Sequence, residues 1–307
     1  ACTVLVCLVL TINSGAGRLL RPGGTGMLGV DIIDVGQGSS ALVRFPAGQT
    51  MLVDSGGFPD SSYDIGSEVL APFLWHESIR RLDYVVLSHY HPDHALGLYF
   101  ILRNFDVGEF WTSEISGEDH EATVIRHHLD EIAAKRKIAI RTFPGLLKNV
   151  AIGPAGARLL HPTAEFLEHA CPKDLNSLSL VVEITFGKTR LVLPGDIGEK
   201  VERSIVPRIE GGMVTLLVAA HHGSRSSSCE EFLDSLRPVA VIFSCGHENL
   251  FHFPAPVVLK RCAKRGIPVY RTDLSGDVHA LSDGRQWTIT TEAGRHTTGV
   301  ERLEKGK

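Results

Sequence analysis

Four side chains of metal-binding types are crowded into the six residues His89-Tyr90-His91-Pro92-Asp93-His94. Residues 82–88, directly before them, have the character of a buried strand, so the group lies on a loop at the C-terminal end of a strand. Ligands of α/β sheets bind at such ends. Loop histidines are commonly solvated, but three imidazoles and a carboxylate in so short a window disfavour that explanation. The sequence therefore predicts an α/β fold with a metal site beside one sheet.

The same loop can serve two ions. Stiffened by Pro92, it can direct His89 and His91 toward one metal while Asp93 and His94 turn toward a second. Imidazole and carboxylate are ligands that suit zinc and manganese, and they serve iron as well. We therefore expect two divalent metal ions, with zinc or manganese as the candidates.

Further ligands are expected at other strand ends, because a catalytic metal needs several protein groups and an open position for water. Asp196 follows the apolar residues 191–193 and could bridge both ions, although a Gly-Asp pair there could instead cap a helix. His221 and His222 follow a strand in the same way. We assign His221 to the metal and His222 to proton transfer or ligand support, and the reverse assignment is nearly as well founded. Asp54 is expected to orient a ligand imidazole, or to form a plain Asp-Gly turn.

Strand and helix patterns alternate through residues 27–292. Expected strands, from short β-branched runs between turn residues, are 28–34, 41–45, 51–54, 84–87, 178–185, 190–193, 214–219, 239–244 and 278–281. Expected helices, from amphipathic spacing, are 95–105, 118–137, 197–207, 229–236 and 256–265. Two sheet-forming halves with helices alongside predict a layered α/β sandwich with helices on both outer faces.

Bulk properties exclude several classes of protein. With 43% apolar and 21% charged residues the chain is neither disordered nor fibrous. A net charge of −4 gives no overall positive field for nucleic acid, so such binding would need a local patch. Residues 135–137 are best explained as a solvated helix face, whereas the basic residues in 260–265 remain a candidate patch. The six cysteines contain no CxxC pair, so neither a thiolate zinc site nor a disulfide framework is indicated.

The two ends of the chain differ from its middle. Residues 1–12 form an apolar run that is too short to span a bilayer alone, and we expect a remnant of a transmembrane helix. A buried strand or a cloning remnant explains the run equally well on composition. Residues 13–26 are rich in glycine and are expected to form a linker. We assign 27–292 to one folded domain and 293–307 to a polar tail.

The HxHxDH motif with a later Asp and a later His resembles the metallo-β-lactamase superfamily. A closer resemblance, from Met27 onward, is to the C-terminal metallo-β-lactamase domain of ComEC-type DNA internalisation proteins of bacterial competence. Its motifs are Asp34-Val35-Gly36-Gln37-Gly38-Ser39-Ser40, Val53-Asp54-Ser55-Gly56, Leu87-Ser88-His89, Asn176-Ser177-Leu178-Ser179, Leu193-Pro194-Gly195-Asp196, His221-His222-Gly223-Ser224-Arg225 and Arg271-Thr272-Asp273.

This resemblance implies an αββα sandwich of two mixed sheets and a metal-dependent hydrolase. It implies a nuclease that degrades one DNA strand while the other is imported. The implied partners are single-stranded DNA, an N-terminal membrane channel region of the same parent chain and other DNA-uptake proteins. The parent protein would lie in the bacterial cytoplasmic membrane. The implied role in DNA entry favours the outer face for this domain, whereas Arg18 and Arg21 weakly favour the cytoplasmic face by the positive-inside rule.

Two departures from the family pattern bear on the site. The superfamily usually places a third histidine before the bridging Asp, whereas this chain has Asn176 there, with His161 as an alternative. The first metal would then be more weakly held or carry more water. Relatives often show His before Pro where this chain has Phe253-Pro254, with His252 one place earlier, and this departure argues against a substrate role for that loop.

The expected reaction is hydrolysis of an anionic phosphodiester. Divalent cations lower the pKa of bound water from 15.7 to about 7 and neutralise charge on phosphoryl oxygens. We expect Asp93, His222 and Asp54 to take part in catalysis.

The expected phosphate-binding groups follow the tandem histidines. Ser224 and Arg225 are placed to hold a phosphate oxygen, and Asp273 and Ser275 are weaker candidates. Ser226 and Ser227 could bind phosphate or, in the case of Ser227, cap the next helix. Two other functions remain open, namely a catalytically weak DNA-binding or gating module and a small-molecule phosphoesterase or lactonase.

Overall fold

The computed structural model of the chain describes residues 26–59, 61–113, 119–142, 145–147, 149–169 and 174–292. The predicted transmembrane remnant at 1–12, nearly all of the linker at 13–26 and the polar tail at 293–307 lie outside these residues. Among the residues described, none of the helices has both the length and the apolar character needed to cross a bilayer.

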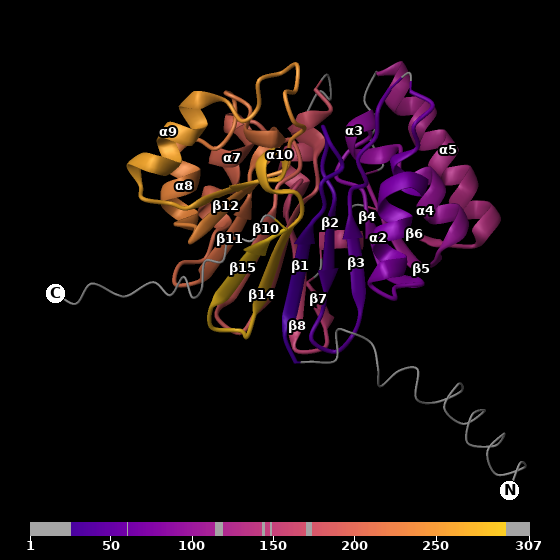
Figure 1. Cartoon of the computed structure of the whole chain (residues 1–307), viewed down its shortest axis with the longest axis horizontal. Helices are drawn as coiled ribbons and strands as arrows, with labels where there is room; N and C mark the ends of the chain where they lie inside the picture. The colour runs from indigo at the N-terminus through magenta and orange to yellow at the C-terminus, as the bar shows by residue number, and fades with distance from the viewer. Residues whose placement is uncertain are drawn as a thin grey trace, which may run out of the picture.

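Two β-sheets form the middle of the molecule (Figure 1). The first sheet has the order β15-β14-β1-β2-β3-β4-β5-β6, and the second has the order β13-β12-β11-β10-β9-β8-β7. The strands of the first sheet are β1 (Leu28–Ile32), β2 (Ala41–Arg44), β3 (Thr50–Val53), β4 (Arg81–Val86), β5 (Asp106–Trp111), β6 (Ala139–Arg141), β14 (Val278–Ser282) and β15 (Trp287–Thr291). Those of the second are β7 (Val150–Ile152), β8 (Ala155–His161), β9 (Val181–Phe186), β10 (Thr189–Leu193), β11 (Val214–Val218), β12 (Ala240–Phe243) and β13 (Val269–Arg271).

Both sheets are mixed. In the first, β3 to β6 run parallel while β15, β14, β1, β2 and β3 pair antiparallel. In the second, β10 to β13 run parallel while β7 to β10 pair antiparallel. The predicted pair of mixed sheets is therefore confirmed.

Helices cover the outer faces of the sheets, with α2, α4 and α5 on one side and α7, α8 and α9 on the other (Figure 1). The helical elements are η2 (Gly66–Leu70), α2 (Ala71–His76), α3 (Pro92–Ala95), α4 (Leu98–Asn104), α5 (His120–Arg136), η3 (Gly145–Leu147), α6 (Ala164–His169), η4 (Asn176–Leu178), α7 (Glu199–Ile205), η5 (Val206–Arg208), η6 (Ala220–Gly223), α8 (Glu230–Leu236), α9 (Pro256–Lys264) and α10 (Thr272–Ser275). The structure thus has the predicted αββα layering.

Three apolar layers hold these elements together. Leu191 and Leu193 of β10 point into the layer between the two sheets, together with Val30 of β1. Val192, between them in sequence, points the other way and packs under α7 and α8. A third layer, which includes Leu52 of β3, lies between the first sheet and α2, α4 and α5. Central strands covered on both faces must be apolar at successive positions, which explains the uninterrupted apolar residues 191–193.

Some element predictions need correction. The helix predicted over 95–105 is divided into α3 and α4, and Gly97 lies between them. A Cβ atom at Gly97 would lie only 2.5 Å from the carbonyl oxygen of Ser55, so the break lets the turn after β3 approach this helical segment. The strand predicted over 178–185 begins only at Val181, because Asn176–Leu178 form a 3-10 turn. The predicted helix start at Glu118 lies outside the described residues, and α5 begins at His120 with Asp119 as its cap.

Candidate metal centre

The predicted ligands lie at strand ends from both sheets. His89 to His94 follow β4 of the first sheet and lead into α3. Asp196 follows β10 of the second sheet, and the tandem histidines follow the neighbouring parallel strand β11. A backbone hydrogen bond of 3.0 Å from His221 N to Gly195 O joins these last two loops. Strand ends that are more than one hundred residues apart in sequence therefore meet at one edge of the sandwich.

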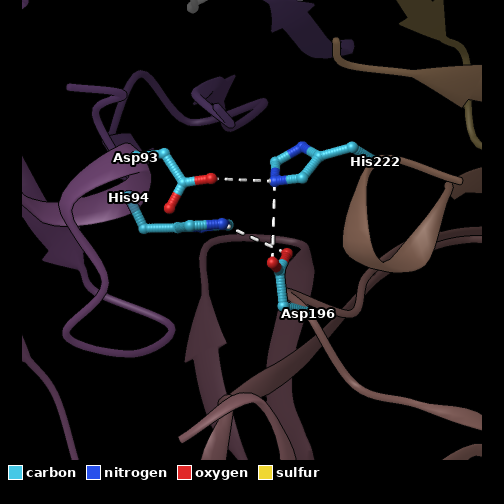
Figure 2. A group of neighbouring side chains, drawn as sticks. All are labelled: Asp93, His94, Asp196 and His222. Atoms are coloured by element: carbon cyan, nitrogen blue, oxygen red, sulfur yellow. Dashed lines mark ion pairs between the residues drawn. The ribbon is translucent and has the colours of Figure 1, made fainter. Parts of the chain in front are cut away.

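Asp93, His94, Asp196 and His222 form a compact cluster (Figure 2). One potential ligand atom from each residue lies within 4.8 Å of those from the others. His222 Nε2 lies 3.3 Å from Asp93 Oδ2 and 3.6 Å from Asp196 Oδ2, and His94 Nε2 lies 3.1 Å from Asp196 Oδ1. Two carboxylates and two imidazoles thus converge on a space of the size that one cation occupies.

The ring orientations fit a metal in this cluster. The Nε2 atoms of His94 and His222 are buried and have no hydrogen-bond partner among the described residues, although carboxylate oxygens lie near both. The opposite nitrogens are held, because His94 Nδ1 contacts Asp54 Oδ2 at 2.8 Å and His222 Nδ1 contacts the Ser244 carbonyl oxygen at 2.9 Å. A ring held through Nδ1 directs Nε2 into the cluster, and in its neutral form it offers the lone pair of Nε2 there, as metal-bound histidines do.

The Asp54 carboxylate contacts Nδ1 of His94, the ring nitrogen opposite the one that faces the cluster. Its Oδ1 accepts a hydrogen bond of 2.7 Å from Ser88 N, and its Oδ2 accepts one of 2.8 Å from Ser88 Oγ besides the contact with His94. The side chain is buried, and its backbone adopts a φ of 58°. Three contacts therefore fix the carboxylate that faces the His94 ring.

The imidazole rings of His89 and His91 face each other beside the cluster, and the His89 ring lies 4.3 Å from the His94 ring, centroid to centroid. His89 Nε2 lies 3.0 Å from His91 Nδ1, and His89 Nδ1 lies within 3.3 Å of the hydroxyls of Ser88 and Ser179. Asn176 Oδ1 is buried without a hydrogen-bond partner among the described residues. The chain after Asn176 is tied to this loop, because Leu180 N donates to Ser88 O at 2.9 Å. The two imidazole nitrogens of His89 and His91 lie within hydrogen-bonding distance of each other.

His161, the alternative to Asn176, makes structural contacts. Its Nε2 donates to the Ser177 carbonyl oxygen at 2.8 Å, and its ring packs against Phe166 at a centroid separation of 4.3 Å. Burial lowers the pKa of His161 to about 4, so the ring is neutral at physiological pH. It lies outside the cluster and supports the turn that carries Asn176.

The tandem histidines differ in their surroundings. His222 is buried and faces the carboxylates, whereas His221 is half-buried with Nε2 3.6 Å from Asp196 Oδ2. Both adopt left-handed backbone angles, with φ of 49° and 54°, which cost about 1–3 kcal/mol each for residues other than glycine. This strained turn aims the His222 ring into the cluster. The geometry therefore favours the alternative assignment, in which His222 is the ligand.

Mutual electrostatics set the protonation states in the cluster. Burial alone would disfavour charged His94, but Asp196, Asp54 and Asp93 outweigh it and raise the pKa of His94 well above its usual value. Burial likewise opposes ionisation of Asp196, yet His94 and His222 lower the pKa of its carboxyl group. Burial and the neighbouring His94 lower the pKa of His89. The carboxylates thus hold protons on His94 and His222, and a cation could take the place of that positive charge.

The loop after the tandem histidines is partly exposed. Arg225 and Ser226 are exposed, and Ser226 Oγ lies 3.1 Å from Ser224 Oγ. Ser227 is not the cap of α8, because its hydroxyl donates to the carbonyl oxygens of Ala220 and Ser224. The buried carboxylate of Glu202 instead accepts hydrogen bonds from Ser228 N and Cys229 N, the two residues directly before α8. Arg225 therefore projects from a loop whose backbone is firmly held.

Asp273 is not brought into the cluster. Its carboxylate pairs with Arg271 at 2.6 Å and accepts a contact of 3.4 Å from Cys245 Sγ. The neighbouring Ser275 is buried in α10. Asp273 therefore connects α10 to Arg271 and to Cys245 in the loop after β12, and Ser275 lies in the same helix.

The motif Asp34–Ser40, which the sequence analysis used only for the family resemblance, also shapes the site. Gly38 has a φ of 142°, and a Cβ atom there would lie 2.4 Å from the Asp93 carbonyl oxygen. Ser39 N donates to that same oxygen at 3.2 Å, and Ser244 Oγ donates to Gly38 O at 2.9 Å. The Gly-Gln-Gly-Ser run was the available signal, since glycines mark close approaches of backbone.

Comparisons with known proteins agree with this geometry. The family model described as the metallo-beta-lactamase superfamily matches residues 33–162. The chain is 28% identical over 273 residues to ComE operon protein 3 of Bacillus subtilis, covering 85% of this chain and 34% of that protein. It is 29% identical over 249 residues to competence protein ComA of Neisseria gonorrhoeae, covering 80% of this chain and 31% of that protein. The chain thus spans about a third of the length of these curated relatives.

A solved structure shows the same fold. The metallo hydrolase Igni18 from Ignicoccus hospitalis superposes with a TM-score of 0.51 at 17% sequence identity, covering 82% of this chain and 98% of that one. This likeness agrees in fold with the match to the family model. The chain carries a metallo-β-lactamase superfamily domain, matched over residues 33–162, and its relatives include the proteins named ComE operon protein 3 and competence protein ComA.

Proposed function

We propose that the chain is a metal-dependent phosphodiester hydrolase that cleaves DNA during competence-associated uptake. The observation that carries this proposal is the cluster of Asp93, His94, Asp196 and His222, in which two buried imidazole Nε2 atoms lack hydrogen-bond partners in the described part of the chain. Such a donor set suits zinc or manganese. The DNA substrate is suggested by the relative named as a competence protein.

The proposed ligand sets follow the two groups of side chains. One ion would be held by Asp93, His94, His222 and Asp196. The other would be held by His89, His91 and the amide oxygen of Asn176, with Asp196 shared between the ions. An amide oxygen binds a cation more weakly than an imidazole in this setting, so we expect the second ion to exchange more readily.

The chain's own residues would bind and orient the substrate around these ions. When bound, the ions supply an acidified water and neutralise charge on the phosphoryl oxygens. Asp54 would keep the His94 ring in the orientation that exposes Nε2. Arg225 and Ser224 would hold a phosphate oxygen at the mouth of the site. His221 is half-buried beside Asp196, and burial lowers its pKa, so its neutral ring could accept a proton there.

The wider setting is proposed from the relatives. We assign 27–292 to the catalytic domain, 1–12 to the end of a transmembrane helix, 13–26 to a linker and 293–307 to a polar tail. The parent protein would then combine this domain with a membrane channel region and meet other DNA-uptake proteins in the bacterial cytoplasmic membrane. Single-stranded DNA would reach the domain on the outer face.

The test is cleavage of a labelled single-stranded oligonucleotide by the purified chain, with Mn²⁺ or Zn²⁺ and with chelator. The proposal expects metal-dependent cleavage that falls at least about a hundredfold in Asp196→Asn, because both ions lose a charged ligand. Asp64→Asn is a matched control, since that carboxylate accepts backbone hydrogen bonds from Gly66 and Ser67 outside the cluster.

The outcomes separate the other two functions. Tight DNA binding without cleavage under any metal would favour a gating module, for which the substitution of histidine by Asn176 gives a physical reason. Turnover of small phosphoesters or lactones without DNA cleavage would favour a small-molecule hydrolase. Cleavage that is equal with and without chelator, or unchanged in Asp196→Asn, would overturn the metal-dependent mechanism.

A further inference from the structure

The loop between β12 and α9 exposes apolar side chains beside the metal cluster. Leu250 is 92% exposed and Phe251 is 63% exposed, whereas Phe253, two residues further on, is half-buried. The sequence alone gave no reason to assign this loop a substrate role. The structure places it directly against the tandem histidines.

A row of aromatic rings connects the cluster to the solvent. The centroid of the Phe253 ring lies 6.3 Å from that of His222 at an interplanar angle of 24°, and 5.7 Å from that of His221 in an edge-to-face arrangement. The Phe251 ring stacks on Phe253 at 5.5 Å with an interplanar angle of 16°. Near-parallel rings thus lead from a proposed metal ligand to an exposed aromatic side chain.

The loop is braced so that these rings are held in place. The Asn249 side chain donates to the carbonyl oxygens of Gly246 and Phe253 at 2.9 and 2.8 Å, and it accepts from Phe253 N at 2.8 Å. Gly246 in turn rests against Gln37, to whose side chain it donates. The Asn249 side chain thus links Gly246 to Phe253, and Phe251 lies in the turn that these hydrogen bonds hold in place.

We propose that Phe251, backed by Phe253, is a stacking platform for an unpaired nucleobase of single-stranded nucleic acid. The inference rests on the proposed function, because it places a nucleoside next to the phosphodiester at the metal centre. Every nucleobase has a flat face, and stacking on protein aromatics is a sequence-tolerant means of binding single strands. The exposed Arg225, on the loop that follows His222, would contact the backbone of the same strand.

Nucleic acid is favoured over a lipid surface by the neighbours of the apolar tip. His247, Glu248 and His252 are exposed around Leu250 and Phe251, and the Glu248 side chain is 87% exposed. Inserting the tip into a bilayer would bring an ionised carboxylate into the apolar region, which is costly. A base stacked on Phe251 leaves these polar side chains in water.

The test compares Phe251→Ala with Phe251→Trp and Leu250→Ala in the full chain. Binding of a fluorescent oligothymidylate is measured by anisotropy, both in chelator and with Ca²⁺, beside an oligonucleotide of the same length made of abasic sites. Stacking predicts at least about fivefold weaker binding of the oligothymidylate by Phe251→Ala. It predicts retained binding by Phe251→Trp, little change in Leu250→Ala, and no difference between the variants on the abasic strand.

Other results would overturn the proposal. An equal loss on the abasic strand would show that the loop acts on the backbone. Equal losses in Leu250→Ala and Phe251→Ala, with Phe251-dependent binding to anionic phospholipid vesicles, would indicate a membrane contact. Absence of oligothymidylate binding by the unmodified chain would also overturn it. These readouts do not require cleavage, so stacking and hydrolysis can fail separately.

Discussion

Replacing Asp54 by asparagine should weaken metal binding without removing a metal ligand. The Asp54 carboxylate accepts from Ser88 N at 2.7 Å, from Ser88 Oγ at 2.8 Å and contacts His94 Nδ1 at 2.8 Å. Asparagine preserves the shape and can keep the bond to Ser88 N through its one oxygen. Its amide group would then face His94 Nδ1, where two donors would meet.

A neutral His94 ring that binds a metal through Nε2 must keep its one proton on Nδ1, opposite this amide group, and it avoids the conflict by placing the proton on Nε2, the atom that faces Asp196 at 3.1 Å. That proton occupies the lone pair which a metal needs. Loss of such an orienting partner typically lowers metal affinity about 10- to 100-fold, which corresponds to ~1.4–2.8 kcal/mol. We therefore expect the dissociation constant for Zn²⁺ to rise by this factor in Asp54→Asn.

The assay is calorimetric titration of the metal-free chain with Zn²⁺, and Asp64→Asn serves as the matched carboxylate substitution outside the cluster. Circular dichroism and thermal unfolding of the metal-free proteins establish that both variants fold. The reasoning is wrong if folded Asp54→Asn binds Zn²⁺ within twofold of the unmodified chain. It is also wrong if Asp64→Asn loses as much affinity.

Three further expectations concern stability and are checked by denaturant or thermal unfolding. Glu202→Ala leaves two N–H groups directly before α8 without their buried acceptor and should destabilise the fold by about 3 kcal/mol, with Glu202→Gln losing less. Arg190→Met should cost about 3 kcal/mol, because it removes a partner of the fully buried Glu183; an unchanged unfolding midpoint would contradict this. The Asp31 carboxylate raises the pKa of His279 through a hydrogen bond of 2.8 Å, so the stabilisation is present below the unfolded pKa of about 6.5 and is lost as pH rises through the raised value. The destabilisation caused by His279→Gln should therefore be larger at pH 5.5 than at pH 9, and equal effects at both would refute the linkage.

Many of the strands and helices can be predicted from local sequence patterns. The strands that carry ligand loops, β4, β10 and β11, are short apolar runs followed at once by polar side chains, and all three were predicted. All four residues of the compact cluster belong to motifs at those strand ends. Strands such as β6 escaped prediction because Ala139, Ile140 and Arg141 are all exposed and show no alternation.

The orientation of individual side chains depends on contacts between residues that are far apart in the sequence, and local patterns do not reveal these contacts. Which of the tandem histidines faces the cluster is decided by two successive left-handed residues and by the carbonyl oxygen of Ser244, 22 positions later. The separation of α3 from α4 at Gly97 depends on how closely Ser55 approaches, which no local pattern reveals. The aromatic row needs Phe253 to lie over His222, 31 residues earlier in the chain.

Ligand groups from different sheets also give the cluster a mechanical consequence. Asp93 and His94 are anchored to the first sheet, and Asp196 and His222 to the second. An ion bound by all four side chains would link the two sheets, so part of its binding free energy would stabilise the packing of one sheet on the other. Without the ion, the pairs that His94 forms with Asp196 and His222 forms with Asp93 would still connect the two sheets, because each pair joins a residue of one sheet to a residue of the other.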